Sequence, residues 1–102
     1  MSIRHYILIE HEVIPAKLLE WARWFETADR TVAYTITTPG VEVSTVFLPL
    51  EPLQSLMKKL DPPIHFETRV FGGEHDDYMQ RYCSWDDALK GHWEVVRMVK
   101  KI

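Results

Sequence analysis

The feature that most constrains the fold is a pair of β-prone runs on either side of a single turn. Residues 31–38 and 41–48 are rich in valine, threonine and aromatic residues, and Pro39–Gly40 separates them. Such a pattern predicts an antiparallel β-hairpin. With Thr38 opposite Val41, the hairpin has one apolar face, as a sheet covered on one side requires. Because Pro–Gly favours a type II turn rather than a primed one, we expect a bulge to shift the register locally. The predicted apolar face comprises Val32, Tyr34, Ile36, Val43, Thr45 and Phe47.

Two amphipathic helices are predicted outside this hairpin. Pro15 opens the first, which runs to about residue 28, because proline is tolerated in a first helical turn. Ser84 caps the second, which runs to about residue 101 with apolar residues along one face. Four apolar residues at helical spacing within residues 52–60 predict a further short helix between prolines.

Strands at residues 3–9, 64–71 and 78–83 complete the set of predicted elements. Consecutive strands joined by tight turns indicate antiparallel pairing. The order of elements therefore predicts one α+β domain spanning residues 1–102. We expect a two-layer sandwich, in which a mainly antiparallel sheet of about five strands carries the two main helices on one face.

Composition excludes several classes of protein. The 102 residues suffice for one domain, and the net charge of −3 disfavours generic nucleic-acid binding. No apolar run approaches the length of a transmembrane helix, so no membrane association is expected. The first residues lack the apolar core and cleavage site of a signal peptide. Together with a single cysteine, Cys83, this predicts a cytoplasmic protein.

Motifs for metals, phosphates and catalysis are missing from the sequence. None of the five histidines stands in the spacing of a zinc site. The acidic run at residues 74–77 is expected to be a solvated turn rather than a cation site. Gly72–Gly73 lacks the lysine and the strand-to-helix context of a phosphate-binding loop. We therefore expect no metal and no cofactor.

Three residues near the last helix need individual interpretation. His92 stands in the middle of the apolar face, so it is either a buried, neutral histidine bonded to a carbonyl or a tyrosine, or a functional group. Gly91 lowers helix stability by about 1 kcal/mol relative to alanine, which suggests a close backbone approach there. Cys83 precedes the helix start, where a thiol can be activated, but without a histidine partner we favour a small core residue.

The most notable predicted surface lies on the strands at residues 64–71 and 78–83. With Phe71 opposite Tyr78, an outer face combines aromatic rings with an arginine and a glutamate. These residue types are common in interface hot spots and in platforms that stack bases, although they also form simple cross-strand pairs. The outer face comprises His65, Glu67, Arg69, Phe71, Tyr78, Gln80 and Tyr82. We name as candidate binding residues Arg30, Glu67, Arg69, Phe71, His75, Tyr78, Tyr82 and His92, and as candidate oligomer contacts Trp24 and Trp93.

Four segments carry a resemblance to known proteins: residues 21–26, 44–48, 66–76 and 88–92. In order and spacing they resemble a group of small accessory proteins common in tailed-phage and prophage genomes. In that group the stretch after residue 48 usually reads Gly-Leu/Ile-Asp-His, whereas this chain has Pro49-Leu50-Glu51-Pro52. The resemblance implies an accessory protein that acts in the bacterial cytoplasm and binds host components, for example to counteract host defence.

Two classes of function remain open. The missing catalytic motifs favour a non-catalytic binding protein, assembled as a homo-oligomer, whose partner is a host protein or a small nucleotide-like ligand. Arg30, Arg69 and Arg81 would then meet phosphate. The alternative is a small hydrolase or lyase, with His75 or His92 as general base and Glu67 or Glu74 as its partner. A minor virion or scaffolding component is a third possibility.

Overall fold

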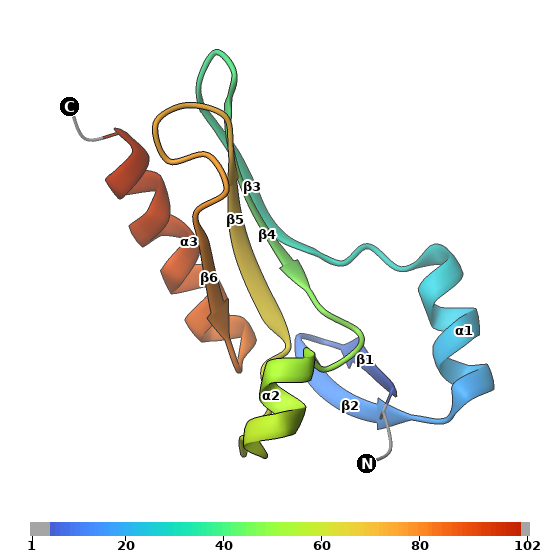
Figure 1. Ribbon diagram of the computed structural model, residues 1–102. Helices are drawn as coiled ribbons and strands as arrows, with labels where there is room; N and C mark the ends of the chain where they lie inside the picture. Colours follow the sequence, from blue (N-terminus) through green and yellow to red (C-terminus); the bar gives the residue numbers. More distant parts are fainter. Residues whose placement is uncertain (1–4, 101–102) are drawn as a thin grey trace.

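The computed structural model describes residues 5–100, which form an α+β fold with six strands and three helices (Figure 1). The predicted fold class is confirmed. The strands are β1 (His5–Ile9), β2 (Glu12–Ala16), β3 (Thr31–Thr38), β4 (Val41–Phe47), β5 (Phe66–Phe71) and β6 (Met79–Tyr82). The helices are α1 (Leu18–Thr27), α2 (Leu53–Lys58) and α3 (Trp85–Lys100).

The strands divide into two antiparallel sheets, where the sequence predicted one. The larger sheet has the order β3-β4-β5-β6, and β1 and β2 form a separate hairpin. Helix α3 runs along one face of the larger sheet and contacts all four of its strands (Figure 1). Under α3 the sheet contributes fully buried side chains, namely Val43, Thr45, Phe47, Phe66, Thr68 and Val70.

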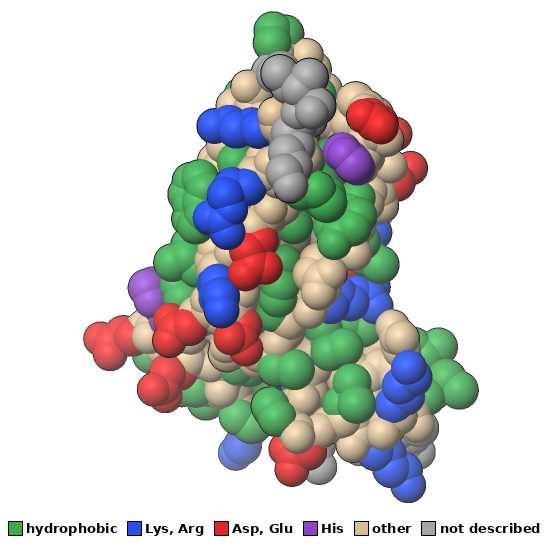
Figure 2. Space-filling view, turned by 90° about the vertical axis from the view of Figure 1, so that its left-hand side faces the viewer, with side chains coloured by type: hydrophobic (Ala, Val, Ile, Leu, Met, Phe, Trp, Pro, Cys, Tyr) green, Lys and Arg blue, Asp and Glu red, His purple; other side chains and the backbone are tan. Residues whose placement is uncertain are grey.

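Helix α3 is capped as the sequence predicts, and its ends are charged. The Ser84 hydroxyl accepts a hydrogen bond from the backbone N–H of Asp87 at 3.1 Å. Acidic side chains occupy the first turn and basic ones the last, an arrangement that the helix dipole favours. Figure 2 shows this side of the molecule, on which acidic and basic side chains both occur among the apolar ones.

The first helix does not lie beside α3, contrary to expectation. Helix α1 packs on β1 instead (Figure 1). It reaches the core through Trp24, whose ring meets that of Phe47 edge-on at 5.6 Å. The face of the larger sheet opposite α3 therefore carries no helix along its length in the described part of the chain.

The β1–β2 hairpin is not predicted by the sequence, because Pro15 is also typical of a helix start. In the structure Pro15 pairs with Tyr6 in β2, and α1 begins three residues later at Leu18. Proline is compatible with β2 because an edge strand does not need every N–H for its ladder. Glu10 and His11 form the tight turn with φ values of 49° and 71°, without the glycine or asparagine that usually signals such a turn.

The β3–β4 hairpin is confirmed, but the predicted faces of β3 are wrong. Thr38 pairs with Val41, and a register shift between Ile36 and Thr38 then places Ile36 opposite Glu42 and Tyr34 opposite Ser44. The expected irregularity near the turn is thus present. It turns Tyr34 and Ile36 away from α3, where they are 51% and 63% exposed.

The predicted register of β5 and β6 is wrong by one residue. Arg69 pairs with Met79 and Phe66 with Tyr82, so Tyr78, Gln80 and Tyr82 lie on the α3 side of the sheet. Glycine at position 91 explains how Tyr82 fits there, since any Cβ at that position would lie 2.2 Å from the tyrosine ring. Such a one-residue difference moves every side chain of a strand to the other face.

Among the helices of residues 5–100, none combines the length and apolar character needed to cross a membrane.

Candidate functional site

The side of the larger sheet opposite α3 is the first candidate site. We call it the uncovered sheet face. Strand pairing assigns to it Tyr34, Ile36, Glu42, Ser44, Val46, Glu67, Arg69, Phe71, Met79 and Arg81. Its four large apolar side chains, Tyr34, Ile36, Phe71 and Met79, are all exposed. A sheet face of this kind is half apolar, which is unusual for a surface that meets only water.

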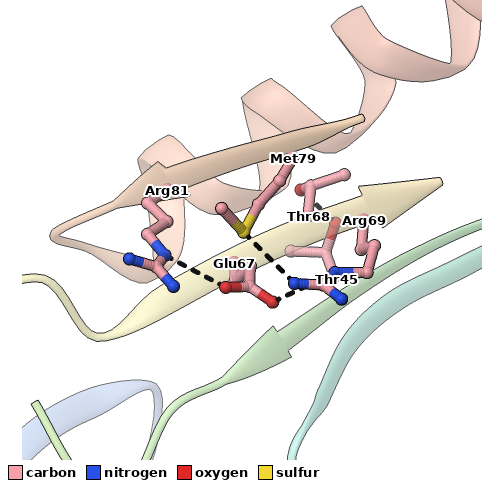
Figure 3. Close-up of polar contacts among 6 residues, drawn as sticks. All are labelled: Thr45, Glu67, Thr68, Arg69, Met79 and Arg81. Carbon is pink, nitrogen blue, oxygen red and sulfur yellow. Dashed lines mark hydrogen bonds and ion pairs between the residues drawn. The ribbon is translucent and has the colours of Figure 1, made fainter. Parts of the chain in front are cut away.

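A small ion cluster lies in the middle of the uncovered sheet face. Figure 3 shows Glu67 of β5 between the guanidinium groups of Arg69 and Arg81. Arg81 Nε donates to Glu67 Oε2 at 3.0 Å, whereas Arg69 Nε is 3.7 Å from Oε1. Arg81 also reaches Gln54 of α2 at 3.5 Å. Because one carboxylate already pairs with both arginines, this cluster is poorly suited to capture the phosphate of a nucleotide-like ligand.

His92, a predicted binding residue, lies instead in the core under the sheet. Its side chain is fully buried. Its Nε2 is 2.8 Å from the Thr35 hydroxyl and its Nδ1 is 2.7 Å from the Thr45 hydroxyl, which in turn is 2.5 Å from that of Thr68. Burial lowers the pKa of His92 below its usual value, so the ring is neutral at pH 7. Both nitrogens are therefore used within the core, with threonines in place of the expected carbonyl or tyrosine.

The remaining predicted residues do not assemble into one site. Arg30 precedes β3 and places its guanidinium 4.9 Å from the centre of the Phe25 ring. His75 lies in the turn between β5 and β6, and Tyr78 and Tyr82 face α3. Of the candidate oligomer contacts, Trp24 packs against the core, whereas Trp93 is 48% exposed. Only Glu67, Arg69 and Phe71 share a face as predicted.

The His–Glu pair proposed for hydrolysis is not formed by His92. Glu67 lies on the uncovered sheet face and His92 under the opposite face, so the sheet separates them. In residues 5–100, no three His, Cys, Asp or Glu side chains gather closely enough to hold a metal ion.

A cavity that the sequence did not predict is the second candidate site. Its volume is about 450 Å³, and it lies where the β1–β2 hairpin meets the segment before β5 and the start of α3. Its lining comes from four separated segments: Tyr6; His11, Glu12, Val13 and Pro15; Pro62, Pro63 and His65; and Cys83, Ser84 and Trp85. The ring of His11 stacks on that of Trp85 at 3.8 Å. Because no single stretch of sequence carries this lining, no local pattern could have revealed it.

His65 is the most constrained polar group of the cavity lining. The sequence placed it on the outer face, but it is only 2% exposed. It precedes β5, and its backbone bonds to Leu48 and Tyr82 direct the side chain inward. Its Nδ1 lies 3.2 Å from the Leu48 carbonyl oxygen. Burial lowers its pKa, opposed by the Leu48 carbonyl and by the charge of Glu51, so the ring is neutral at pH 7.

The protonation of His65 follows from this hydrogen bond. A carbonyl oxygen can only accept, so the proton of the neutral ring is on Nδ1, and Nε2 carries a lone pair. That Nε2 is buried and has no hydrogen-bond partner among the described residues. His65 is thus a lining residue of the cavity whose second ring nitrogen is a buried and unused acceptor.

Cys83 of the same cavity is not an activated thiol. Its Sγ donates to the Pro62 carbonyl oxygen at 3.4 Å. Burial raises the pKa of the thiol, and the negative charge of Asp87 raises it further. The thiol therefore stays protonated at pH 7. Cys83 is nevertheless a half-buried residue of the cavity lining, not the core residue that the sequence predicted.

Comparison of the chain with models of protein families, with curated proteins and with solved structures found no match.

Proposed function

We propose that this chain is a non-catalytic binding protein, whose working surface is the uncovered sheet face and whose binding partner there is a second copy of itself. In keeping with the resemblance noted above, its setting would be that of a phage or prophage accessory protein in the bacterial cytoplasm. The observation that carries the proposal is the exposure of Tyr34, Ile36, Phe71 and Met79 on one sheet face. Among residues 5–100, α3 is the helix that packs along the larger sheet, and it covers the other face.

The charges of this face suit a copy of the same face. It carries two acidic residues, Glu42 and Glu67, and two basic ones, Arg69 and Arg81. Arg69 pairs with Ser44 of β4, and Glu42 lies two residues before Ser44 on the same strand and the same face. Its side chain is 42% exposed. A two-fold axis between these positions would therefore bring Arg69 of each subunit toward Glu42 of the other.

The size of the face indicates how tight such a dimer would be. Four strands about 4.8 Å apart and about six residues long, at about 3.4 Å per residue, span a projected area of about 400 Å². Two such faces together give about 800 Å² of projected area, and the relief of the side chains raises the buried surface to roughly 1,000 Å². This lies at the lower bound for specific interfaces. We therefore expect a dimer that forms at high protein concentration and dissociates on dilution.

Sedimentation velocity over a wide concentration range tests the proposal. The wild type should approach twice the mass of the chain as its concentration rises. Ile36→Glu, which places a charge on the 63% exposed residue of the face, should remain monomeric. Leu19→Glu is the matched control, because Leu19 is 72% exposed on α1. It should dimerise as the wild type does, and circular dichroism should show both variants folded.

Two results would overturn the proposal. A wild type that remains monomeric at every concentration would mean that no second copy covers this face. Equal dimerisation of wild type and Ile36→Glu would place the interface elsewhere.

A further inference from the structure

We propose that the cavity between the β1–β2 hairpin and the start of α3 binds a small aromatic molecule, neutral or cationic, that donates a hydrogen bond to His65. Its volume of about 450 Å³ falls within the range of about 300–1,000 Å³ that is typical of ligand sites. The site is distinct from the uncovered sheet face, and its occupation does not depend on dimer formation.

The unused acceptor of His65 defines one requirement for the ligand. Its Nδ1–H donates to Leu48, which leaves the Nε2 lone pair without a partner in the described chain. Buried acceptors in native proteins are nearly always satisfied, and an exception calls for an explanation such as a bound molecule. Nε2 itself is covered by neighbouring side chains, so a ligand reaches it only when the cavity wall shifts. An N–H or O–H group would then satisfy it, whereas a ligand with acceptors alone would not.

The charges around the cavity define a second requirement. Glu12 belongs to the lining, and Asp86 and Asp87 follow directly in the first turn of α3. No lysine or arginine is among the described residues that line the cavity. The partial positive charge at the N-terminus of α3, about half a unit, does not offset these three carboxylates. An anionic ligand would therefore meet net repulsion, while a neutral or cationic one would not. The nucleotide-like ligand expected from the sequence does not fit this cavity.

The walls define the third requirement, which is an apolar and planar body. Three prolines and the rings of Tyr6 and Trp85 belong to the lining. Trp85 is held edge-on against Phe66 at 6.4 Å and is stacked by His11. Rigid walls of this kind favour a flat ring. Aromatic and proline side chains lose little conformational entropy when a ligand packs against them.

Four small probes separate these requirements. Phenol carries a ring and an O–H donor, and anisole is the same ring with the donor methylated. Benzylamine is a cationic ring, and benzoate an anionic one. Each would be titrated into the ¹⁵N-labelled chain, and chemical-shift changes followed at Val13, Ser84 and Trp85, which line the cavity.

We expect phenol and benzylamine to give saturable shifts confined to the cavity. Anisole should bind about tenfold more weakly, as is typical for the loss of one hydrogen bond. Benzoate should give no saturable shift. His65→Phe, which keeps a ring but removes the acceptor, should abolish the difference between phenol and anisole. His75→Phe, in the turn between β5 and β6, is the control and should preserve it.

Several outcomes would overturn the proposal. These are the lack of any saturable shift with phenol and benzylamine, equal binding of phenol and anisole to the wild type, and tighter binding of benzoate than of benzylamine. The comparisons among probes use the wild type alone, so they remain decisive even if His65→Phe does not fold. Sedimentation of the same samples keeps this result separate from that of the dimer.

Discussion

Replacing Gly91 with alanine should destabilise the protein, although the same change stabilises most helices. Alanine is favoured over glycine in a helix interior by about 1 kcal/mol. Here, however, the new Cβ would lie 2.2 Å from Cε1 of Tyr82 and 2.4 Å from its hydroxyl oxygen, well inside ordinary contact at 3.4 Å. Overpacking of a core costs about 1–3 kcal/mol. Because the ring is packed against the core, we expect the upper end of that range and a net loss of about 2 kcal/mol.

A double-mutant cycle with Tyr82→Ala tests the cause of this loss. With the ring removed, Gly91→Ala should stabilise the chain by about 1 kcal/mol, so the sign of its effect reverses. The coupling between the two positions would then be about 3 kcal/mol, as is typical of residues in direct contact. Urea unfolding followed by circular dichroism measures each corner of the cycle.

A neighbouring position provides the control for helix propensity. Lys90→Gly, at an exposed position of the same helix, should cost about 1 kcal/mol without involving Tyr82. Stabilisation of the wild type by Gly91→Ala would refute the close approach of the tyrosine ring. So would an effect of the same sign in both backgrounds.

Two further predictions concern buried polar groups. Thr45→Val should lower the free energy of unfolding in urea by about 1–3 kcal/mol, because it leaves Nδ1 of His92 without a partner. Thr37→Val is the control and should be nearly neutral, because the Thr37 hydroxyl is buried without a hydrogen-bond partner among the described residues. Equal effects of the two substitutions would contradict the assigned network. The pKa values of His65 and His92 are lowered from 6.5, so below pH 6.5 the unfolded chain binds more protons than the folded one. The free energy of unfolding should be highest above that pH and decline as the pH falls, by up to about 1.4 kcal/mol per pH unit for each histidine. A free energy of unfolding that does not change across this range would exclude neutral buried histidines.

Elements with a strong local pattern were predictable from the sequence. The apolar stripe and serine cap of α3 and the two runs around Pro39–Gly40 each combine periodicity with a turn or cap signal. The β1–β2 hairpin lacks such a signal. Its turn residues, Glu10 and His11, are uncommon at positive φ, and its proline is also typical of a helix start.

The faces of the strands were less predictable than the strands themselves. In β3 a register shift near the turn reverses which side chains face α3, and in β6 a difference of one residue does the same. Gly72, Gly73 and Asp77 adopt positive φ in the connection between β5 and β6, so its geometry is not that of a simple hairpin turn. The residues on the candidate surface therefore differ from those predicted. The observed face contains Met79 and Arg81 in place of Tyr78, Gln80 and Tyr82, and His65 is buried instead of lying on it.

The cavity lies beyond the reach of sequence patterns for a different reason. Four segments far apart in the chain supply its lining, and the state of its histidine is set by a carbonyl seventeen positions away. Such properties arise only when the fold brings these segments together. They depend on tertiary distances rather than on the order of residue types.

The bonds of His92 bear on how α3 finds a unique position. A helix held only by valines and alanine could slide along the sheet by one turn and still meet apolar groups. At any such shifted docking, the imidazole and the hydroxyls of Thr35 and Thr45 would lose their mutual bonds inside the core. Each stranded polar group would carry a desolvation penalty of about 1–3 kcal/mol. We therefore expect the histidine to fix the position of α3 on the sheet, because it penalises shifted dockings more than it strengthens the native one.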